Sequence, residues 1–491
     1  MDRKIEDLIT KIKHYNSNAD FALIRKAYLF AEKAHLGQKR RSGEDFINHP
    51  LAVANYLADW RLDSRSIVAG LLHDTVEDAE VTLLQIEGQF GETVAKLVDG
   101  VTKIGEIKLR GRREEAFVEN LRKMLVVMAQ DLRVIVVKLA DRYHNMQTLY
   151  VLPIEKQKQI AGETIGIYAP LAERLGIGEM KGNLEDLAFP YLLPAEYHWV
   201  KNYSKAYFKE ADTCIKKVKQ QLLRVFSEEE IKAQVDGRQK HLYSLYLKLN
   251  RPEINKDIRK IYDLMALRVI VDTVEDCYRV LGLVHKHYKP IPAVGIRDFI
   301  AQPKPNGYQS IHTTVFGYHG KITEMQIRTQ IMHEEAENGI AAHWYFSQEK
   351  ATSKDSQVEA GFFAPTEKLL WVKELMKWQK EITDSKEFID SLKFDALTHR
   401  NFIFSPNGDV FDLPAGATPV DFAYAVHTNL GDICGGAKVD GKLVPLDYRL
   451  KSGQIVEIIP KKVRSGPSRD WLNFVITRTA KRQIEKHFNK R

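Results

Sequence analysis

A histidine and a carboxylate stand side by side at His73–Asp74, and a second acidic pair, Glu77–Asp78, follows four residues later. In a helix, residues four apart share a face, so these four side chains would crowd one polar edge. The carboxylates repel one another, and a bound divalent cation would remove that cost. The alternative is a solvated acidic helix edge, which is the commoner explanation of an isolated His-Asp pair.

Two further residues complete a candidate metal site. His49 lies in the sequence INHP, and Asp141 begins the sequence DRYHNMQTL. Together with the His73–Asp74 pair they offer two imidazoles and two carboxylates. Such a mixed nitrogen and oxygen set suits Mn²⁺, Fe²⁺ or Zn²⁺, and the residue types do not choose among these metals.

Helices must bring these ligands together. Apolar residues recur at three- and four-residue spacing in five stretches, which are Phe21–His35, Leu51–Trp60, Ser64–His73, Glu92–Val98 and Arg133–Leu149. We therefore expect residues 1–197 to form an all-α domain.

Basic residues gather further along the chain, where a strand over Ile231–Arg238 is expected to turn into a helix. Arg238 and Lys240 are two residues apart, and Lys240, Ser244 and Lys248 follow at a spacing of four. One face would then carry two ammonium groups and a hydroxyl at the positively biased start of a helix, which suits a polyphosphate. The alternative is a solvated basic face.

A second pair of carboxylates lies on expected strands. Asp263 stands at the mouth of the buried-strand pattern DLMALRVIV, and Glu324 lies on the return strand of a hairpin that turns at Gly317–Gly320. On neighbouring strands these two residues could share a metal, as paired carboxylates do in nucleotidyl transfer. Tyr308, in a loop beside Gly307, is free to stack on a base. We expect residues 198–395 to form an α+β domain.

The residues that follow change character. Short strands over Asn401–Ser405 and Gln454–Ile459, a turn at Asn407–Gly408 and a short helix near Val420–His427 indicate a small β-grasp unit at 396–462. Residues 463–491 read as one amphipathic basic helix. From position 461 to the last residue there are ten Lys or Arg and two acidic residues, which accounts for the whole net charge of +8. A basic tail indicates one contact surface rather than general affinity for nucleic acid.

Length and composition are those of a multidomain globular protein. The sequence of 491 residues is too long for one compact core, and its 44% hydrophobic and 28% charged residues are ordinary proportions. No apolar run approaches the roughly 20 residues that span a bilayer. Cys214, Cys277 and Cys434 lie far apart, without a disulfide or zinc pattern. We expect a cytoplasmic protein without membrane contact.

The pattern of His, His-Asp and Asp on helices resembles the HD-type metal phosphohydrolases. Longer stretches resemble the hydrolase domain of the RelA/SpoT family, whose members make and destroy the alarmone (p)ppGpp. These stretches are HLGQKRRSGEDFINHPLAVA, LLHDTVED, FGETVAKLVDGVTKI and KLADRYHNMQTL.

The resemblance implies roles for individual residues. A Mn²⁺ ion would lower the pKa of a bound water for attack on a 3′-pyrophosphate, and its ligands would be His49, His73, Asp74 and Asp141. Glu77 and Asp78 would be the acid/base or water-positioning pair. The nucleotide contacts would be Arg40, Arg41, Asn145 and Thr148. Each of these residues could instead have a purely structural role, in a surface-exposed basic turn or in a helix cap.

The sequence PKPNGYQSIHTTVFGYHGKITEMQIRT resembles the synthetase domain of the same family. The resemblance implies that Asp263 and Glu324 hold Mg²⁺, with Glu324 also assisting removal of the hydroxyl proton. Tyr308 would stack on the guanine of GDP or GTP, with Asn306 and His312 close to the acceptor. Pyrophosphate would pass from ATP to the 3′-hydroxyl. The ATP phosphates would be neutralised by Arg238, Lys240, Lys248 and Lys304.

One departure from the family concerns the residues before DFIAQPK. Members with both activities usually carry an Arg-x-Lys-Asp sequence there, and this chain has Gly295, Ile296, Arg297 and Asp298, with an apparent one-residue insertion upstream. Of the two basic positions in that sequence, Arg297 keeps the second, and Gly295 replaces the first. A hydrolase with a weakened synthetase is therefore an alternative to a fully bifunctional enzyme.

The sequences FIFSPNGDVFDLPAGATPVDFAYAVHT and GAKVDGKLVPLDYRLKSGQIVEI resemble a TGS domain. The resemblance makes His427 a candidate contact to the end of a tRNA, although a histidine that finishes a helix is an equally good explanation. A regulator that binds the ribosome or uncharged tRNA is the third hypothesis. The ACT-type module of long family members is absent from the sequence. Because opposing activities would waste ATP, we expect nucleotide on the synthetase to control the hydrolase site at Leu71–Asp78.

Overall fold

The computed structural model describes residues 3–106, 127, 130–292, 294–304, 307–339, 400–451, 453–461 and 466–489. The chain divides into two compact units, Met1–Ile300 with Tyr308–Glu381, and Ala301–Gly307 with Ile382–Arg491. Within the described ranges, no helix has the length and apolar character needed to cross a membrane. The predicted boundary at 395 lies outside the described residues.

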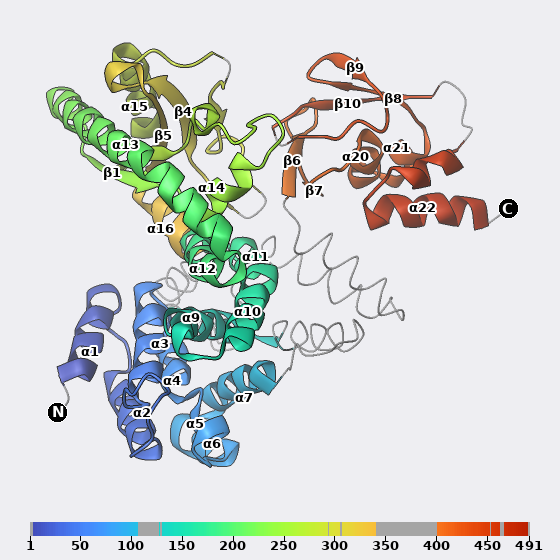
Figure 1. Cartoon of the computed structure of the whole chain (residues 1–491). Coiled ribbons are helices and arrows are strands. Elements are labelled where there is room, and N and C mark those ends of the chain that lie inside the picture. Colours follow the sequence, from blue (N-terminus) through green and yellow to red (C-terminus); the bar gives the residue numbers. More distant parts are fainter. Residues whose placement is uncertain are drawn as a thin grey trace. The chain divides into compact units, whose positions relative to one another are not determined.

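In the first part of the first unit, every named element of the described residues 3–192 is a helix, as predicted (Figure 1). Its helices bury an apolar core that includes Ile24, Leu57, Ile67 and Ile135. Their bounds are α1 Arg3–Tyr15, α2 Phe21–Ala34, α3 Asn48–Asp59, α4 Ser64–Leu72, α5 Thr75–Asp78, α6 Leu83–Phe90, α7 Glu92–Glu106, α9 Arg133–Gln147, η1 Leu149–Val151, α10 Ile154–Glu163, η2 Thr164–Tyr168, α11 Ala169–Arg174 and α12 Gly178–Leu192.

The segment Leu71–Asp78 differs from the expected continuous helix. Helix α4 ends at Leu72, α5 begins at Thr75, and the His73–Asp74 pair lies between them. His73 is buried, whereas the Glu77–Asp78 pair is exposed. His73 therefore lies in the core and the Glu77–Asp78 pair at the surface, although both residues between the helices keep right-handed helical dihedral angles.

A buried ion cluster joins the starts of two helices that carry candidate ligands. Asp63 caps α4, because its side chain accepts a hydrogen bond from Ser66 N. Arg133, at the start of α9, lies 3.4 Å from Asp63 and 2.7 Å from Asp131. Arg133 and Asp63 are both buried. This cluster fixes α4 and α9 relative to each other at the ends remote from His73 and Asp141.

The second part of the first unit contains a five-stranded sheet in the order β1-β2-β5-β4-β3. Strands β2 and β5 are parallel neighbours, and the other pairs are antiparallel. The bounds are α13 Pro194–Glu228, β1 Ala233–Gln239, α14 Leu242–Leu249, η3 Ile258–Lys260, β2 Met265–Val271, α15 Val274–His287, β3 Arg297–Asp298, β4 Ile311–Phe316, η4 Tyr318–Gly320, β5 Ile322–Thr329 and α16 Gln330–Asn338.

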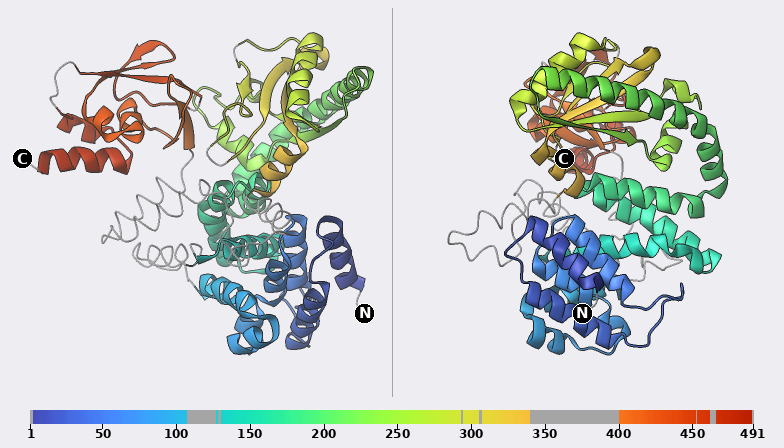
Figure 2. Two further views of the ribbon diagram at one scale, coloured as in Figure 1. Left: turned by 180° about the vertical axis from the view of Figure 1, so that it is seen from behind. Right: turned by 90° about the vertical axis from the view of Figure 1, so that its left-hand side faces the viewer.

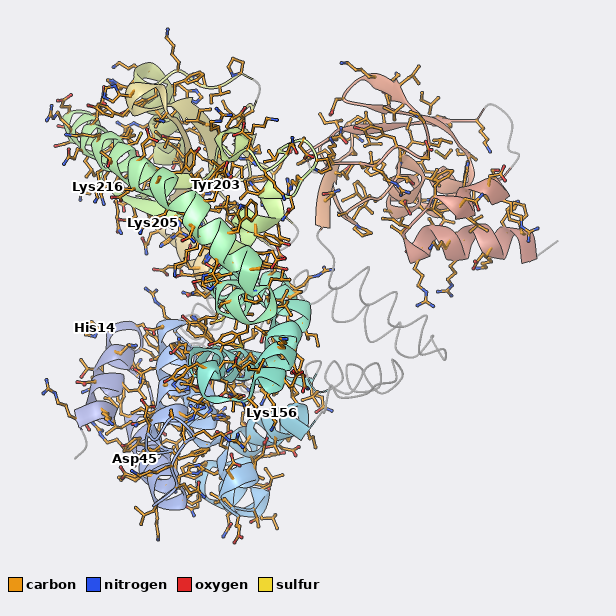
Figure 3. The ribbon with its side chains drawn as sticks, in the orientation of Figure 1. His14, Asp45, Lys156, Tyr203, Lys205 and Lys216 are labelled. Atoms are coloured by element: carbon orange, nitrogen blue, oxygen red, sulfur yellow. The ribbon has the colours of Figure 1, made fainter. Side chains whose placement is uncertain are left out.

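Helix α13 runs along the sheet, as two further views show (Figure 2), and packs on β1 and β2. Its apolar face, with Val218 and Leu222, enters the core of the sheet region. The opposite face is basic, and Lys205 and Lys216 are exposed along it (Figure 3). The helix begins at Pro194, so the predicted domain boundary at residue 197 falls inside a continuous helix.

The second unit contains the short strands and the helix that the sequence predicts after residue 400. One sheet pairs β6 with β7, the other has the order β10-β8-β9, and a parallel bridge between Phe404 and Ile455 connects them. The bounds are β6 Arg400–Phe404, β7 Val410–Pro414, α20 Pro419–Val426, α21 Thr428–Asp432, β8 Cys434–Val439, β9 Lys442–Val444, β10 Val456–Pro460, η6 Arg469–Asn473 and α22 Arg478–Asn489.

The expectation of one continuous basic helix after residue 463 is wrong. A 3₁₀ turn, η6, ends at Asn473, and α22 begins only at Arg478. The buried carboxylate of Asp421 causes the break, because it accepts hydrogen bonds from Ile476 N, Thr477 N and Thr477 Oγ1 at 2.7–3.1 Å. The segment is also no separate tail, since it shares an apolar core with α20.

Candidate metal and nucleotide sites

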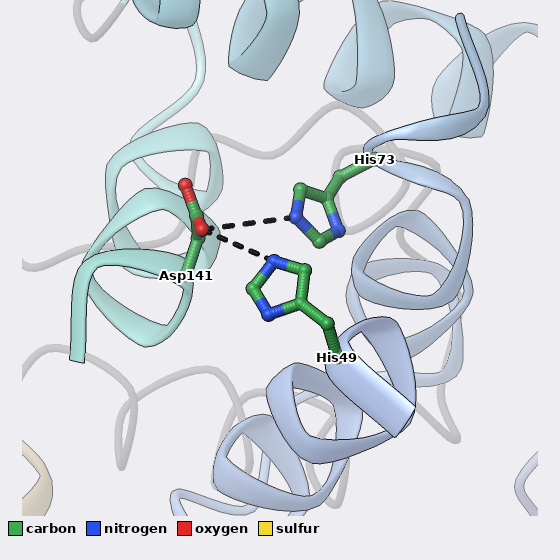
Figure 4. Close-up of side chains that lie close together, drawn as sticks. All are labelled: His49, His73 and Asp141. Carbon is green, nitrogen blue, oxygen red and sulfur yellow. Dashed lines mark ion pairs between the residues drawn. The ribbon is translucent and has the colours of Figure 1, made fainter. Parts of the chain in front are cut away.

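Two histidines and two aspartates converge between α3, α4 and α9. His49 Nε2 lies 3.2 Å from Asp74 Oδ2 and 3.3 Å from Asp141 Oδ1, and His73 Nε2 lies 3.0 Å from Asp74 Oδ1. Figure 4 shows His49, His73 and Asp141 pointing toward one another. His73 Nε2 is buried and makes no well-formed hydrogen bond with any described group. A buried nitrogen aimed at two carboxylates fits a divalent metal ion.

The charges in this cluster depend strongly on one another. Burial alone would raise the pKa of Asp74, but the adjacent His73 and His49 imidazoles hold it well below its usual range. Burial would lower the pKa of His73, and the Asp74 carboxylate raises it to about 9. Burial opposes the ionisation of Asp141 as well, yet Lys138 and His49 keep its pKa low. The site therefore strongly favours positive charge between its carboxylates.

Hydrogen bonds orient both imidazoles. His73 Nδ1 donates a hydrogen bond to Gly70 O at 2.8 Å, which leaves Nε2 as the nitrogen that faces the carboxylates and could bind a metal. His144 Nδ1 lies 2.8 Å from His49 Nδ1. The same His144 nitrogen lies 2.7 Å from the guanidinium of Arg40. Burial and the neighbouring His49 and Arg40 lower the pKa of His144 to about 4, which makes it a neutral acceptor.

His144 and Lys138 are functional candidates that the sequence analysis missed. Lys138 Nζ lies 2.8 Å from Asp141 Oδ2, and Asn145 donates to Asp141 Oδ1 at 2.5 Å. Both missed residues lie in the stretch KLADRYHN, three positions before and after Asp141. That spacing on α9 was the available signal.

A cavity of about 650 Å³ opens beside Asp141. Its lining includes all four predicted nucleotide contacts, which are Arg40, Arg41, Asn145 and Thr148. Lys138, Arg142 and Lys156 add positive charge, and Figure 3 labels Lys156 on α10. A basic cavity that reaches a candidate metal ligand such as Asp141 can hold a phosphorylated ligand. Arg40 also donates to Asn145 Oδ1 at 2.7 Å, and Asn145 in turn donates to Asp141, so Arg40 is connected to the candidate metal site.

The predicted acid/base pair lies at the surface on α5. Although the Glu77 side chain reaches the surface, partial desolvation by the protein around it raises its pKa to about 7, with the Asp74 and Asp141 carboxylates acting in the same direction and Lys138 against it. Partial burial and Asp74 also raise the pKa of Asp78. A carboxyl group that titrates near neutral pH can exchange protons with a reacting water.

The sheet carries a second polar site around Asp263. Lys240 Nζ and Lys248 Nζ lie 2.8 and 2.6 Å from the same oxygen, Asp263 Oδ2. Burial opposes ionisation of Asp263, but the two ammonium groups hold its pKa well below the usual range. The prediction that Lys240, Ser244 and Lys248 share a helix face is wrong for Lys240, because α14 begins at Leu242. The two lysines nevertheless converge.

Glu324 lies on β5, the strand beside β2. Arg297 lies 2.7 Å and His312 Nδ1 3.2 Å from Glu324 Oε1, and these neighbours lower the pKa of Glu324 against the effect of burial. The sequence analysis expected Tyr308 to be unrestrained, but its hydroxyl lies 2.7 Å from His312 Nε2. Two carboxylates at adjacent strands fit Mg²⁺, which takes one or two protein carboxylates together with water and phosphate oxygens.

The remaining predicted positions are less closely tied to these clusters. Arg238 is half-buried on β1, and Ser244 is half-buried on α14. Lys304 belongs to the second unit, where its carbonyl accepts from Gly307 N at 2.7 Å. Asn306 lies outside the described residues. Gly295 has a φ of 68°, a left-handed conformation that glycine adopts more readily than residues with a side chain.

His427 lies in the second unit between α20 and α21. It is exposed, and its Nδ1 accepts a hydrogen bond from Asn429 N at 3.2 Å. The side chain therefore caps α21. Both explanations of His427, a contact to the end of a tRNA and a histidine that finishes a helix, stay open.

A helical fold with clustered His and Asp ligands defines the HD class, and the family models agree. The HD domain model matches residues 27–178, the model described as the region found in RelA / SpoT proteins matches 237–351, and the TGS domain model matches 401–460.

Relatives match along nearly the whole chain. It is 47% identical over 476 residues to a GTP pyrophosphokinase of Myxococcus xanthus, covering 96% of this chain and 61% of that protein. It is 44% identical to a guanosine-3′,5′-bis(diphosphate) 3′-pyrophosphohydrolase of Aquifex aeolicus, covering 99% of this chain and 67% of the other. The bifunctional (p)ppGpp synthase/hydrolase SpoT of Escherichia coli is 45% identical, with 98% and 66% covered.

The chain belongs to the RelA/SpoT family. It spans between 55% and 61% of the length of the first three relatives that it matches.

Proposed function

We propose that this chain is a bifunctional alarmone enzyme that hydrolyses (p)ppGpp at the cluster around His73 and synthesises it at the sheet around Asp263. The observation that carries the proposal is the presence of both constellations in one chain: a His and Asp cluster beside a basic cavity, and two lysines converging on a carboxylate. Relatives named for each activity, and one named for both, support it.

For hydrolysis, His49, His73, Asp74 and Asp141 would hold Mn²⁺, which supplies an activated water when bound. Arg40 and Arg41, with Asn145 and Thr148, would hold the guanosine nucleotide in the adjoining cavity. Glu77 and Asp78 would accept and return the proton of the attacking water. Lys138 would keep Asp141 oriented through its Oδ2 oxygen.

For synthesis, Asp263 and Glu324 would hold Mg²⁺, which supplies charge neutralisation at the transferred group. Lys240 and Lys248 would then exchange Asp263 for the phosphates of ATP, with Arg238, Ser244, Arg297 and Lys304 as further contacts. Tyr308, held by His312, would stack on the guanine, with Asn306 close to the acceptor. Glu324 would receive the proton of the 3′-hydroxyl.

The two reactions separate experimentally. Wild-type protein should release pyrophosphate from ppGpp with Mn²⁺ and make ppGpp from ATP and GDP with Mg²⁺. Asp74→Ala should abolish hydrolysis and spare synthesis, and Asp263→Ala should do the reverse. If both substitutions left both reactions unchanged, the assigned sites would be wrong.

A hydrolase with a weakened synthetase is a second candidate. The observation that favours it is the Arg297–Glu324 ion pair beside Gly295, which occupies a proposed metal ligand with a protein cation. A synthetic rate far below the hydrolytic rate in the wild-type protein would select this candidate.

Domain limits and partners also belong to the proposal. The hydrolase would occupy residues 1–197, the synthetase 198–395 and the TGS domain 396–462, with the basic segment 463–491 after it. The TGS domain, His427 and the basic segment would contact uncharged tRNA or the ribosome. The three free, buried cysteines suit a reducing cytoplasm.

A further inference from the structure

We propose that Asp186, a residue of helix α12 at the end of the HD region, is a positioning residue for pyrophosphate transfer by the sheet region. This inference rests on the proposed synthetase function. Asp186 Oδ2 lies 2.9 Å from His241 Nδ1, and Asp186 Oδ1 accepts a hydrogen bond from Tyr243 N at 2.9 Å. One carboxylate of α12 therefore binds the start of α14 at two points.

Helix α14 depends on this outside carboxylate. His241 is its N-cap residue, and the His241 side chain makes no capping hydrogen bond to the helix. The first amides of a helix lack partners within the helix, and a capping acceptor typically contributes about 1 kcal/mol. Asp186 supplies that acceptor and places a negative charge at the positive end of α14.

The surface of α12 is shaped around His241. A Cβ atom added to Gly182 would lie 2.3 Å from the His241 ring. Gly182 is one turn before Asp186, so the ring lies over the glycine while its Nδ1 reaches the carboxylate. Tyr243 packs edge-on against Phe189 of α12, with ring centroids 5.2 Å apart. Space, hydrogen bonds and aromatic packing thus fix α14 on α12.

The position of α14 determines where the two active-site ammonium groups lie. Lys240 directly precedes His241, and Lys248 is in the last turn of the eight-residue helix. Both side chains reach Asp263 Oδ2. A shift of α14 would therefore move both groups relative to the phosphates, and a misplacement of about 1 Å can cost roughly 100-fold in rate. Asp186 acts through these lysines and touches no reacting atom.

Substitutions at Asp186 test the proposal in the full chain. Asp186→Ala should lower kcat for ppGpp synthesis from ATP and GDP about 10- to 100-fold, while Mn²⁺-dependent ppGpp hydrolysis stays within about twofold. Asp186→Asn keeps an oxygen for Tyr243 N and should restore most of the synthesis. The matched control is Glu173→Ala, which removes an exposed carboxylate paired with Lys181 of α12 but away from α14.

Amide hydrogen exchange gives a readout that needs no activity. Exchange at Tyr243 N and the first turn of α14 should be faster in Asp186→Ala than in the wild type and in Asp186→Asn. Unchanged synthesis and unchanged exchange in Asp186→Ala would overturn the proposal. An equal loss of synthesis and hydrolysis, with a lower thermal midpoint, would also overturn it by making Asp186 a folding residue. If wild-type protein makes no ppGpp, the proposed function fails, whereas the exchange experiment still decides whether Asp186 caps α14.

Discussion

At the scale of single residues, His144 controls which nitrogen of His49 faces the metal site. His144 Nδ1 lies 2.8 Å from His49 Nδ1 and 2.7 Å from Arg40, so Nδ1 of His49 is engaged by His144 and Nε2 is the nitrogen that faces the two aspartates. His144→Phe should lower Mn²⁺ affinity about 10- to 100-fold, the usual effect of removing a hydrogen-bond partner of a metal ligand. Titration of free Mn²⁺ by electron paramagnetic resonance measures this affinity.

The neighbouring substitution Tyr143→Phe is the control for His144, because Tyr143 packs on Tyr56 rather than on a metal ligand. It should leave Mn²⁺ affinity unchanged. Full Mn²⁺ affinity in His144→Phe would show that packing alone orients His49.

The convergence of the four candidate ligands could be anticipated from their residue types together with the distinctive flanking sequences, and their role as metal ligands stays a prediction. The partners that orient them could not be anticipated. His144 reaches His49 across 95 positions of sequence. Tyr308 was expected to be unrestrained, and only the fold shows that it meets His312.

At the scale of helices, the buried Arg133 at the start of α9 ties this helix to α4 through Asp63. Its side chain is 7% exposed, and that of Asp63 is 9% exposed. Arg133→Ala would leave Asp63 buried without its partner, and breaking a buried ion pair in this way costs about 3 kcal/mol. Urea unfolding followed by circular dichroism should show this loss of stability in the first unit.

The comparison for Arg133 is Lys96→Ala, which removes an exposed ion pair with Glu92 on α7. Because exposed pairs contribute little, this variant should unfold at the wild-type urea concentration. An Arg133→Ala protein that is equally stable would mean that α4 and α9 are held by apolar packing alone.

Helix positions followed from periodicity, whereas the breaks did not. The helices α2, α3, α4, α7 and α9 lie where apolar spacing predicts them. The interruption at 474–477 depends on a distant group. Asp421 captures the amides of Ile476 and Thr477 from 55 and 56 positions away. The sequence around residues 474–477 gives no indication that Asp421 is their partner.

At the scale of the molecule, the segment after residue 466 has two separable roles in the second unit. Trp471, Val475 and Ile484 are buried in its core, whereas Lys481, Arg482 and Lys486 are exposed on α22. Replacing these three cations by glutamate should weaken tRNA binding and lower the slope of log K against log salt by about 2 to 3. Fluorescence anisotropy with labelled tRNA at several salt concentrations measures the slope.

Thermal unfolding of the same triple variant is the control, and its midpoint should be that of the wild type. Deleting 463–491 instead would remove the core residues, so it tests folding rather than binding. Unchanged tRNA affinity in a folded triple variant would exclude this face of α22 as the contact surface.

Helix α12 also connects the regions that hold the two proposed catalytic sites. It packs on α9, which carries Asp141, and on α14 and α16 of the sheet region. If ligands at the two sites favour different arrangements of α12, each will weaken the other, and such couplings are typically 5- to 150-fold. Because simultaneous synthesis and hydrolysis would waste ATP, we expect a non-reactive ATP analogue to slow Mn²⁺-dependent ppGpp hydrolysis. The rate would be measured across a titration of the analogue. Lys248→Ala is the control: it should weaken the analogue at the synthetase and remove the inhibition, whereas inhibition that persists would mean competition inside the hydrolase cavity.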